Sequence, residues 1–597
     1  MCGIAGIITT NNCLVKTFEE DIGNMTDTII HRGPDGFGYY YADNHAFGHR
    51  RLSIVDLSEA GHQPMHYLDR YTITYNGEIY NHIELRQELI ELGYIFNSDT
   101  DTEVIMASYD AWGVECLNKF NGMWAFVIYD NHTKKYFMSR DRFGVKPFYF
   151  FKNSDTFLFA SEIKAILEHP AVEAIPNLDF LQKFVNGYSC EYLKETAFSD
   201  IFRFDFSSYF EGTIDDIFDN FIVKRFWQIK PNLSKESFNK KKLKYYAQRY
   251  YDLLEDAVRI RLRADVKVGA ALSGGLDSSS IVYLVNKQLK ERGASNSLET
   301  FSSVYKSDGT QECDESRFID EVANSLGVHS NQIEPAEADI PSDIENMIWH
   351  LENPPENSLM SSWNTFKLVG SSDVTITLDG QGADEQLAGY TSYLTSYIAS
   401  LSSISILVEA WLLYRRIPGV KDYVLRGMCV GMFRNVFGTK RTKRLLNYLK
   451  WDVEMHLNQR LAEHTMSILI TLIHYADHTS MAFSVESRMP FMDYRLVEFL
   501  ASVPACYKIR KGWTKYLARV AFDGKLPDSV VWRKDKMGWP IPEKKWFLGG
   551  LSDWFLSKSN DTRILSRLNF REETRNRFPI RVKKLNLSLW YQIFIKK

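Results

Sequence analysis

Cysteine pairs, long apolar runs and a large charge excess are all missing from this chain of 597 residues. Its seven cysteines are scattered, odd in number and nowhere spaced C-x-x-C, which argues against a disulfide framework and a zinc site and favours a reducing cytoplasm. The net charge of −4 gives no reason to expect a nucleic-acid partner. The cysteines are Cys2, Cys13, Cys116, Cys190, Cys313, Cys429 and Cys506.

Membrane signals are also scarce. The N-terminus has no basic segment followed by an apolar run, so we expect no signal peptide. The apolar stretch 404–414 is about half of the ~20 residues that span a bilayer, and Glu409 interrupts it, so we predict a buried helix there. The following run, 415–450, holds ten Lys and Arg against one acid, Asp422. It is either a solvated face or a surface that contacts an anionic partner, membranes included.

What the chain does have is a cysteine at position 2, within the opening MCGIAGI. Methionine is removed efficiently before a small side chain, so Cys2 can become the mature N-terminus. It would then carry a thiol nucleophile together with an α-amine whose pKa is about 8, which can act as a local base. The alternative interpretation is that Cys2 is a small hydrophobic residue buried at the start of a strand.

The hydrophobic pattern divides the chain. Short β-rich runs with a few helical segments in the first 165 residues predict layered sheets covered by helices. Residues 170–240 lack sustained periodicity and read as a connector. From about 243 strands alternate with helices, which predicts a parallel sheet, and beyond 390 the pattern is mostly helical. We therefore expect domains at 1–200 and 241–597, joined by a connector at 201–240.

Two glycine-containing loops each follow a predicted strand. The first, LSGGLDSS at 272–279, combines glycines, hydroxyls and a helix N-terminus, a cradle suited to pyrophosphate; a plain capped turn is the alternative. The second, LDGQGADE at 378–385, ends a later strand. Strand carboxyl ends line the ligand crevice of an open α/β sheet, so both loops should meet there, and Asp277 and Asp384 can share a Mg²⁺ ion. Charge compensation at a helix N-terminus is the alternative for Asp384.

These motifs resemble two known families. SGGLDSS (273–279) is similar to the pyrophosphate loop of the N-type ATP pyrophosphatases, and the N-terminal half resembles a class II glutamine amidotransferase. The collinear matches together resemble glutamine-dependent asparagine synthetase over nearly the whole chain. They are MCGIAGI (1–7), HRGPDG (31–36), GHRRLSIVDLSEAGHQPM (48–65), YNGEIYN (75–81), SDTDTEV (98–104), RDRFGVKPFY (140–149), ASEIKAI (160–166), HYADHTSMAFSVESRMPFMD (474–493) and RKDKMGWPIP (533–542).

The resemblance implies a fold for each half. The N-terminal half should be an Ntn-hydrolase-type αββα sandwich. The C-terminal half should be a doubly wound parallel-sheet ATP-pyrophosphatase domain with helical additions. A homodimer is common in this family.

It also implies roles in a glutaminase site. Cys2 would attack the glutamine side-chain amide, and Asn76 with the Gly77 N–H would form the oxyanion hole; Asn76-Gly77 can also be read as a hairpin turn. Arg51 would pair with the α-carboxylate, and Glu78 and Asp101 would take the α-ammonium. Leu52, Ile54 and Val55 complete the expected glutamine-binding residues.

In the second site, ATP would activate a carboxylate as an acyl-adenylate, which ammonia attacks after crossing an internal tunnel. Lys536 would neutralise the departing pyrophosphate, with Lys534 as the nearby rival. The residues expected around the nucleotide are Leu272, Ser273, Gly274, Gly275, Asp277, Ser278, Ser303, Asp379 and Gly380.

The match departs from the family pattern at the second loop. Asp379 stands where Ser is common and Gln381 replaces an acid, while Trp539 stands where Phe is usual. We therefore carry three hypotheses for the acceptor. It is aspartate, giving asparagine, or it is another carboxylate, such as a uronic acid in surface-polysaccharide assembly. In the third hypothesis there is no acceptor, and the chain is a glutaminase or scaffold without synthetase activity.

Overall fold

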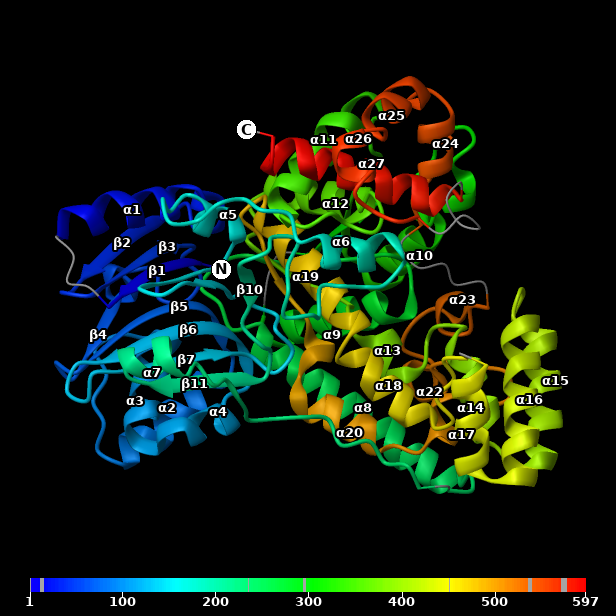
Figure 1. Cartoon of the computed structure of the whole chain (residues 1–597). Helices are drawn as coiled ribbons and strands as arrows, with labels where there is room; N and C mark the ends of the chain where they lie inside the picture. Colours follow the sequence, from blue (N-terminus) through cyan, green and yellow to red (C-terminus); the bar gives the residue numbers. More distant parts are fainter. Residues whose placement is uncertain are drawn as a thin grey trace.

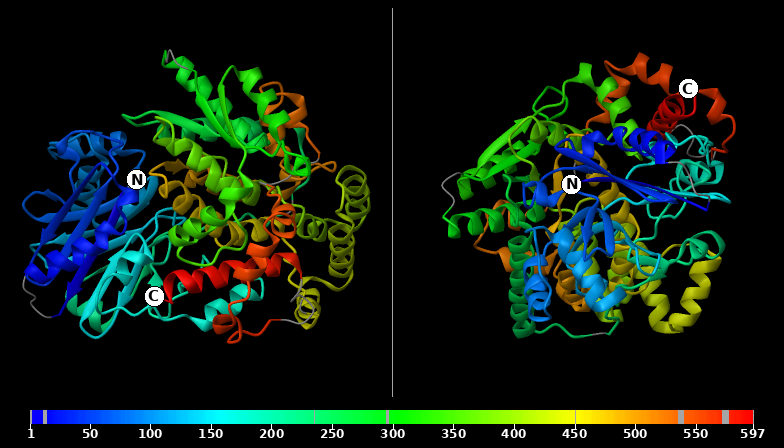
Figure 2. Two further views of the ribbon diagram at one scale, coloured as in Figure 1. Left: turned by 90° about the horizontal axis from the view of Figure 1, so that it is seen from above. Right: turned by 90° about the vertical axis from the view of Figure 1, so that its left-hand side faces the viewer.

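The computed structural model describes residues 2–10, 15–234, 236–293, 297–449, 451–534, 540–570 and 577–596. Two halves lie side by side, with the N-terminal half in blue and cyan in Figure 1 and the later half, which is mostly helical, in green to red. Figure 2 shows the same two halves from above and from the side of the N-terminal sheets.

The N-terminal half contains two six-stranded antiparallel sheets. The first has the order β10 (Ile201–Arg203), β8 (Tyr149–Lys152), β9 (Thr156–Ala160), β1 (Gly3–Thr9), β3 (His45–Arg51), β2 (Gly36–Tyr41). The second has the order β12 (Lys224–Arg225), β11 (Ser208–Gly212), β7 (Lys135–Arg140), β6 (Gly122–Asp130), β5 (Tyr71–Ile79), β4 (Met65–Tyr67).

The two sheets stack face to face, and helices cover their outer faces (Figure 1). Buried aromatic and aliphatic side chains of β1, β3, β6 and β7 fill the space between the sheets. Helices α1 (Val15–Asp27) and α5 (Ile163–Leu167) pack on the first sheet, and α2 (His82–Glu91), α3 (Asp101–Trp112) and α4 (Cys116–Lys119) lie on the side of the second. The predicted αββα layering is confirmed.

The predicted connector at 201–240 is wrong for its first part. Strands β10 to β12 extend the edges of both sheets, and α7 (Ile214–Asp219) packs on β11 of this half. The earlier helix α6 (Leu178–Val185) contacts α27 (Phe578–Phe594) of the later half. These strands are only two to five residues long, too short to show a period of two, so the pattern missed them. Only the stretch between β12 and residue 240 runs without helix or strand in its described part.

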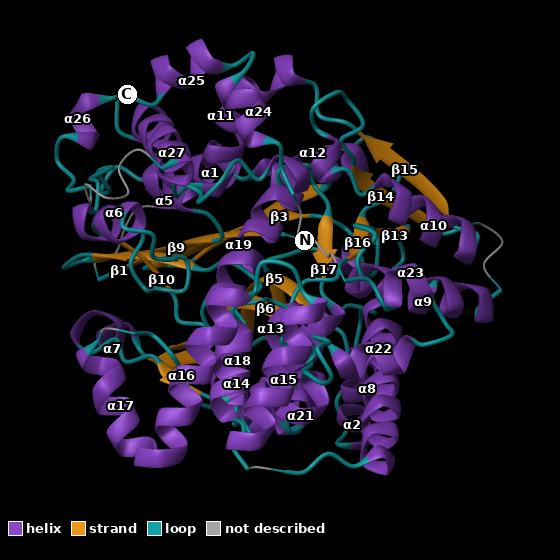
Figure 3. Cartoon of the chain, turned by 90° about the vertical axis from the view of Figure 1, so that its right-hand side faces the viewer, coloured by secondary structure: helices purple, strands orange, loops and turns teal. Residues whose placement is uncertain are grey.

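The later half is built on a five-stranded sheet (Figure 3). All neighbouring strands are parallel. Their order is β15 (His329–Ile333), β14 (Glu299–Ser303), β13 (Val268–Ala271), β16 (Ile376–Leu378), β17 (Glu486–Arg488). The order reverses at β13, so the sheet has a switch point beside the strand that leads into the 272–279 loop, where ligands bind in such sheets.

Helices cover this sheet as a right-handed doubly wound fold requires, with those that follow β13 and β14 on one face and those that precede and follow β16 on the other. The prediction of a doubly wound parallel sheet is confirmed. The helices of this core are α8 (Lys240–Arg261), α9 (Leu276–Glu291), α10 (Ser316–Leu326), α11 (Ile340–Leu351), α12 (Met360–Gly370), α13 (Ala383–Leu387), α18 (Leu457–Thr465), α19 (Ile468–Met481), α20 (Tyr494–Ser502), α21 (Ala505–Lys508), α22 (Tyr516–Phe522) and α23 (Asp528–Val531).

The helical additions form two groups at the periphery (Figure 1). One comprises α24 (Glu543–Leu548), α25 (Ser552–Lys558), α26 (Thr562–Leu565) and α27 (Phe578–Phe594). The other comprises α14 (Tyr393–Ser400), α15 (Ser403–Arg416), α16 (Lys421–Phe437) and α17 (Thr439–Tyr448).

The apolar run 404–414 lies on α15, so the predicted helix is confirmed, but its predicted burial is wrong for one side. Ile406 and Leu413 are buried, whereas Ile404 is 81% exposed and Trp411 56% exposed. A helix in a peripheral layer has neighbours, here α14 and α16, on one side only, which the sequence does not reveal. Among the helices of the described ranges, none is both long and apolar enough to cross a membrane.

Candidate active sites

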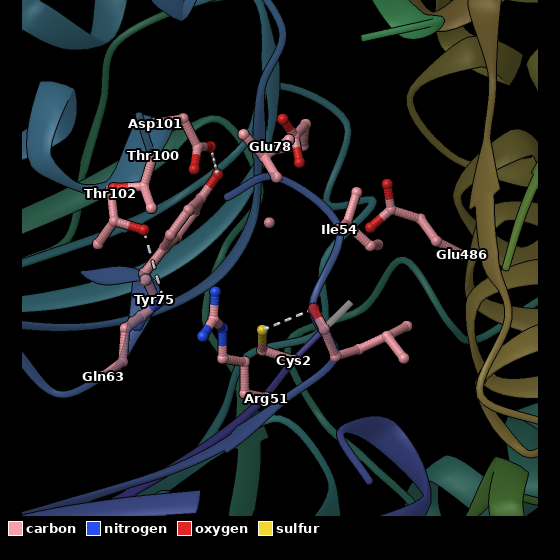
Figure 4. Close-up of a pocket in the computed structure, with 14 residues that line it drawn as sticks. Cys2, Arg51, Ile54, Gln63, Tyr75, Glu78, Thr100, Asp101, Thr102 and Glu486 are labelled. Atoms are coloured by element: carbon pink, nitrogen blue, oxygen red, sulfur yellow. Dashed lines mark hydrogen bonds between the residues drawn. The ribbon is translucent and has the colours of Figure 1, made fainter. Parts of the chain in front are cut away.

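A small pocket opens beside Cys2 (Figure 4). Its volume, which includes space open to solvent, is about 430 Å³. Each glutamine-binding residue expected from the resemblance lines it, apart from Asn76, which contacts Cys2 directly. The lining residues are Cys2, Arg51, Leu52, Ile54, Val55, Gly61, Gln63, Tyr75, Gly77, Glu78, Thr100, Asp101, Thr102 and Glu486.

Cys2 is held by its place before β1, a central strand between β3 and β9. Its backbone N–H donates to Asn76 Oδ1 at 3.2 Å, and its thiol lies 4.0 Å from the Leu52 carbonyl oxygen. Burial raises the pKa of the Cys2 thiol. The thiol is therefore neutral at rest, and a base must take its proton before it can attack.

Asn76 and Gly77 lie inside β5, where they pair with Ala125 and Trp124 of β6. The alternative reading of Asn76-Gly77 as a hairpin turn is therefore wrong. A Cβ on Gly77 would lie 2.2 Å from the Met123 carbonyl oxygen, so only glycine fits beside this neighbour. The close approach leaves the backbone at Gly77 bare toward the pocket, as an N–H donor to an oxyanion requires.

Arg51 ends β3, and its guanidinium donates to the carbonyl oxygens of Asp56 and Ser58, the latter at 2.7 Å. A Cβ on Gly61 would lie 2.0 Å from Arg51 Nη2, so Gly61 leaves room for the side chain. Carbonyl partners hold the guanidinium without neutralising its charge. Arg51 can therefore still pair with a carboxylate ligand.

Two buried carboxyl groups, Glu78 and Asp101, face the same pocket. Asp101 accepts hydrogen bonds from Tyr75 Oη and from the Ile79 N–H, each at 2.7 Å. Burial raises the pKa of both carboxyls, and the charge of Asp101 raises that of Glu78 further. A ligand ammonium between them would stabilise their ionised forms, which fits the expected α-ammonium site.

The sequence did not point to several lining residues. Gln63 bridges the pocket wall, because its Oε1 accepts from the Tyr75 N–H at 2.8 Å and its Nε2 donates to Thr102 at 3.4 Å. The least expected is Glu486, which lies on β17 of the other half and approaches the pocket from a separate ribbon in Figure 4. Both residues fall in family-matching stretches, but no local pattern marks their contacts.

A larger cavity lies at the carboxyl ends of β13 and β16, and its volume is about 1260 Å³ when the space open to solvent is included. Both glycine loops meet there, as predicted. From the first loop Ser273, Gly275, Asp277 and Ser278 line the cavity, and from the second Asp379, Gly380, Gln381 and Asp384 do. The other lining residues are Ala271, Asn357, Leu359, Ser361, Ser362, Phe366, Tyr390, Leu472, Tyr475, Ala476 and Ile541.

Three residues expected around the nucleotide do not line this cavity. Leu272 is buried in the core. Ser303 bonds instead to the Ser361 carbonyl oxygen at 2.8 Å and to Thr365 at 3.0 Å. Gly274 has a left-handed φ of +70°, and a Cβ there would meet Phe318, so its role in this structure is to shape the turn.

Asp277 and Asp384 converge, as predicted, but on a lysine. Lys515 Nζ lies 2.5 Å from Asp384 Oδ1 and also bonds to Asp277. Two carboxylates aimed at one cation position fit Mg²⁺, which takes one or two protein carboxylates and fills its remaining positions with phosphate and water oxygens. No cluster of three or more His, Cys, Asp or Glu side chains suited to a metal occurs within the part of the chain that the structure describes.

Asp379 is buried at the end of β16 and accepts hydrogen bonds from Thr377, at 3.3 Å, and from Ser487. Burial raises the pKa of Asp379 to about 6. Near neutral pH this side chain can therefore gain or lose a proton, a property that the serine usual at this position lacks.

The expected pyrophosphate lysine, Lys536, lies outside the described residues, as does Trp539. Lys534 lines a neighbouring cavity with Lys515 and three arginines, Arg416, Arg519 and Arg533. Arg416 is the last residue of α15, so the helical addition reaches this neighbouring cavity.

The two halves meet through buried ion pairs. Arg32 Nη1 bonds to Glu162 within the N-terminal half at 2.8 Å, and its Nη2 bonds at 2.8 Å to Asp477 on α19 of the other half. Lys146 lies 3.3 Å from the same Asp477. These groups are buried, so removing any one would leave an unpaired charge in the interior. The interface is therefore a fixed part of the fold.

Comparison with known families agrees with this division. Residues 1–227 match the model of a glutamine amidotransferase domain, and residues 249–580 match that of asparagine synthase. Two asparagine synthetases (glutamine-hydrolysing) of Bacillus subtilis, numbers 3 and 1, are 30% and 31% identical, each over 93% of this chain and 89% of the relative. An amidase of Gibberella zeae, chry2, is 27% identical over 92% of this chain and 90% of its own length.

A glutamine amidotransferase domain followed by an ATP-using synthase domain defines an ATP-dependent carbon–nitrogen ligase that takes its nitrogen from glutamine. Within that class, the chain belongs to the asparagine synthetase family.

Proposed function

We propose that this enzyme makes asparagine from aspartate, glutamine and ATP. The observation that carries the proposal is the convergence of Cys2, Arg51, Glu78 and Asp101 on one pocket while both glycine loops border another, in a chain whose relatives are named asparagine synthetases over nearly their whole length.

The glutaminase half of the reaction begins at Cys2. After methionine removal, its α-amine takes the thiol proton, and sulfur attacks the carboxamide carbon of glutamine. Asn76 Nδ2 and the Gly77 N–H stabilise the negative charge on oxygen. The C–N bond breaks, the amine returns the proton to the leaving nitrogen, and ammonia departs. Water then cleaves the thioester to give glutamate and the free thiol.

In the synthetase half, the acceptor carboxylate attacks the α-phosphorus of ATP, so that pyrophosphate leaves and an acyl-adenylate remains. Ser273, Ser278 and the N-terminus of α9 would bind the phosphates. Asp277 and Asp384 would hold Mg²⁺, which supplies positive charge for the leaving group. Ammonia then attacks the acyl carbon, and AMP departs as the amide forms.

Ammonia must pass between the halves without being protonated, because ammonium is not a nucleophile. The buried interface around Arg32, Lys146 and Asp477 supports an internal route, since it keeps the two halves in fixed contact.

A second acceptor, a carboxylate such as a uronic acid, is favoured by one observation. Aspartate carries an α-carboxylate that a site normally pairs with a cation. None of the described residues that line the larger cavity is Arg or Lys, and three are Asp. A sugar uronate has no second carboxylate to pair.

The deciding experiment measures AMP and pyrophosphate formation by the full chain with ATP, glutamine and a panel of carboxylates. Aspartate-dependent AMP release together with asparagine formation supports the first proposal. AMP release with a uronate-sugar and none with aspartate overturns it. Release of glutamate with no AMP from any acceptor would mean that the chain is a glutaminase alone.

A further inference from the structure

The strand β17 contains only three residues, Glu486, Ser487 and Arg488, yet it borders both sites. All three side chains are buried. Successive side chains of a strand point to opposite faces, so Glu486 and Arg488 share one face and Ser487 takes the other. The side chains on one face approach the glutamine pocket, and the side chain on the other face approaches the nucleotide cavity.

On the first face, Glu486 lines the glutamine pocket, and Arg488 contacts two carboxylates of its lining. Glu486 lines the pocket beside Cys2, and the charge of Glu486 contributes to the raised pKa of the Cys2 thiol, after the larger effect of burial. Arg488 Nε donates to Glu486 Oε1 at 2.5 Å, and Arg488 Nη2 lies 3.4 Å from Glu78. One guanidinium from the synthetase half therefore holds a carboxylate on each side of the glutaminase site.

Arg488 is itself anchored in the synthetase half. Its Nη1 donates to the carbonyl oxygens of Arg261 and Arg263, each at 2.7 Å, at the end of α8. The guanidinium therefore cannot follow Glu78 or Glu486 if either carboxylate moves. A change in the position of β17 has to change the glutamine pocket.

On the opposite face, Ser487 contacts a residue of the nucleotide cavity. Its hydroxyl donates to Asp379, which lines that cavity. The backbone repeats the link, because the Asp379 N–H donates to the Arg488 carbonyl oxygen at 2.8 Å and Leu378 pairs with Arg488. A ligand that displaces Asp379 therefore pushes directly on β17.

We propose that β17 couples the two reactions: Glu486 and Arg488 are positioning residues for glutamine hydrolysis, and Ser487 ties their strand to the nucleotide cavity through Asp379. The inference rests on the proposed glutaminase activity and is independent of which carboxylate is the acceptor. Since coupling is reciprocal for binding, glutamine occupancy also alters nucleotide affinity.

The first test compares Glu486→Gln and Glu486→Asp with the wild-type chain in glutamine-dependent and ammonia-dependent AMP formation. We expect the KM for glutamine to rise about tenfold or more in Glu486→Gln, because Arg488 loses one of its charged partners beside the pocket. Glu486→Asp keeps the charge and should recover part of the loss. Ammonia-dependent turnover should stay within about twofold, which also reports that β17 has folded.

The second test measures glutamate release with and without ATP plus acceptor. In the wild type we expect these ligands to change the kcat/KM of glutaminase by about fivefold or more. In Ser487→Ala, the ratio of kcat/KM with these ligands to kcat/KM without them should move toward one, while basal glutamate release remains. Ser371→Ala, at an exposed serine of the same half, serves as the matched control.

The outcomes separate the inference from the function on which it rests. A wild-type chain that releases no glutamate contradicts the proposed function. If the wild-type chain does release glutamate, either of two results overturns the inference. The first is that Glu486→Asp and Glu486→Gln both keep the wild-type KM for glutamine. The second is that Ser487→Ala keeps the full response to ATP and acceptor.

Discussion

The two sites are built differently. The glutamine pocket rests on β1 and β3, which pair in the first sheet, and on β5 of the second sheet, which packs against both of them. The backbone of these strands holds Cys2, Arg51 and Asn76 in place. The nucleotide cavity instead lies where loops leave the ends of parallel strands, and its two expected metal ligands are bridged by Lys515. Strand neighbours supply a pre-formed site, whereas the loop site depends on its ligands to complete it.

The sharpest separation of the two sites should come from Cys2→Ala. Without the nucleophile, glutamine-dependent amide formation should fall by about 10⁴-fold or more, while ammonia-dependent formation stays unchanged. Parallel assays with glutamine and with ammonium chloride test this. Cys429→Ala, at an exposed cysteine on α16, is the control and should retain both activities. Loss of both in Cys2→Ala would mean that the sites do not divide the reaction in this way.

The reverse separation should come from Asp277→Asn. Removing one of the two carboxylates that converge on the cation position should lower pyrophosphate release by about 10²-fold or more, because the charge of the leaving group is then poorly neutralised. Glutamate release in the absence of ATP should be unchanged. Asp373→Asn, at an exposed carboxylate of the same half, should leave both rates intact. Normal pyrophosphate release by Asp277→Asn would remove Asp277 from the metal site.

Within the strand-built site, Asn76→Ala should lower the kcat for glutamine hydrolysis by about 10²–10³-fold, the usual cost of losing one oxyanion donor. The KM for glutamine should change much less, because Arg51, Glu78 and Asp101 remain. Steady-state glutamate release gives both parameters. A large rise in KM at constant kcat would instead make Asn76 a substrate-binding residue.

The smallest expected effect concerns Asp379 in the loop-built site. Its pKa is about 6 in the folded chain and 3.8 when unperturbed, so the folded state binds this proton more tightly. Stability should therefore fall as pH rises from about 4 to about 6 and stay lower above that range. Asp379→Asn removes this dependence. The Tm of the variant minus the Tm of the wild type should therefore be about 2 °C larger at pH 8 than at pH 5. Equal Tm shifts in the two proteins would contradict the raised pKa.

Part of this arrangement was open to prediction. The opening MCGIAGI, the YNGEIYN stretch and the SGGLDSS loop supplied Cys2, Asn76, Gly77 and most of the phosphate cradle, because each of these stretches resembles a family motif residue by residue. Lys515 was missed because a lysine at the start of an ordinary helix gives no sign of two distant aspartates. Glu486 was missed because the contact crosses 484 positions of sequence, from residue 2 to residue 486.

The sequence by itself determined the family and the two kinds of fold, and it supplied the residues that we propose for glutamine hydrolysis, since these follow from local motifs and from hydrophobic periods of two and 3.6. Only the tertiary structure decided that β10 to β12 complete the first domain, that one side of α15 is exposed and that Lys515 lies between Asp277 and Asp384. It also decided that β17 of one half forms a wall of the other half's pocket. Each of these depends on which surfaces meet when the chain packs, and burial is set by neighbours that are remote in sequence.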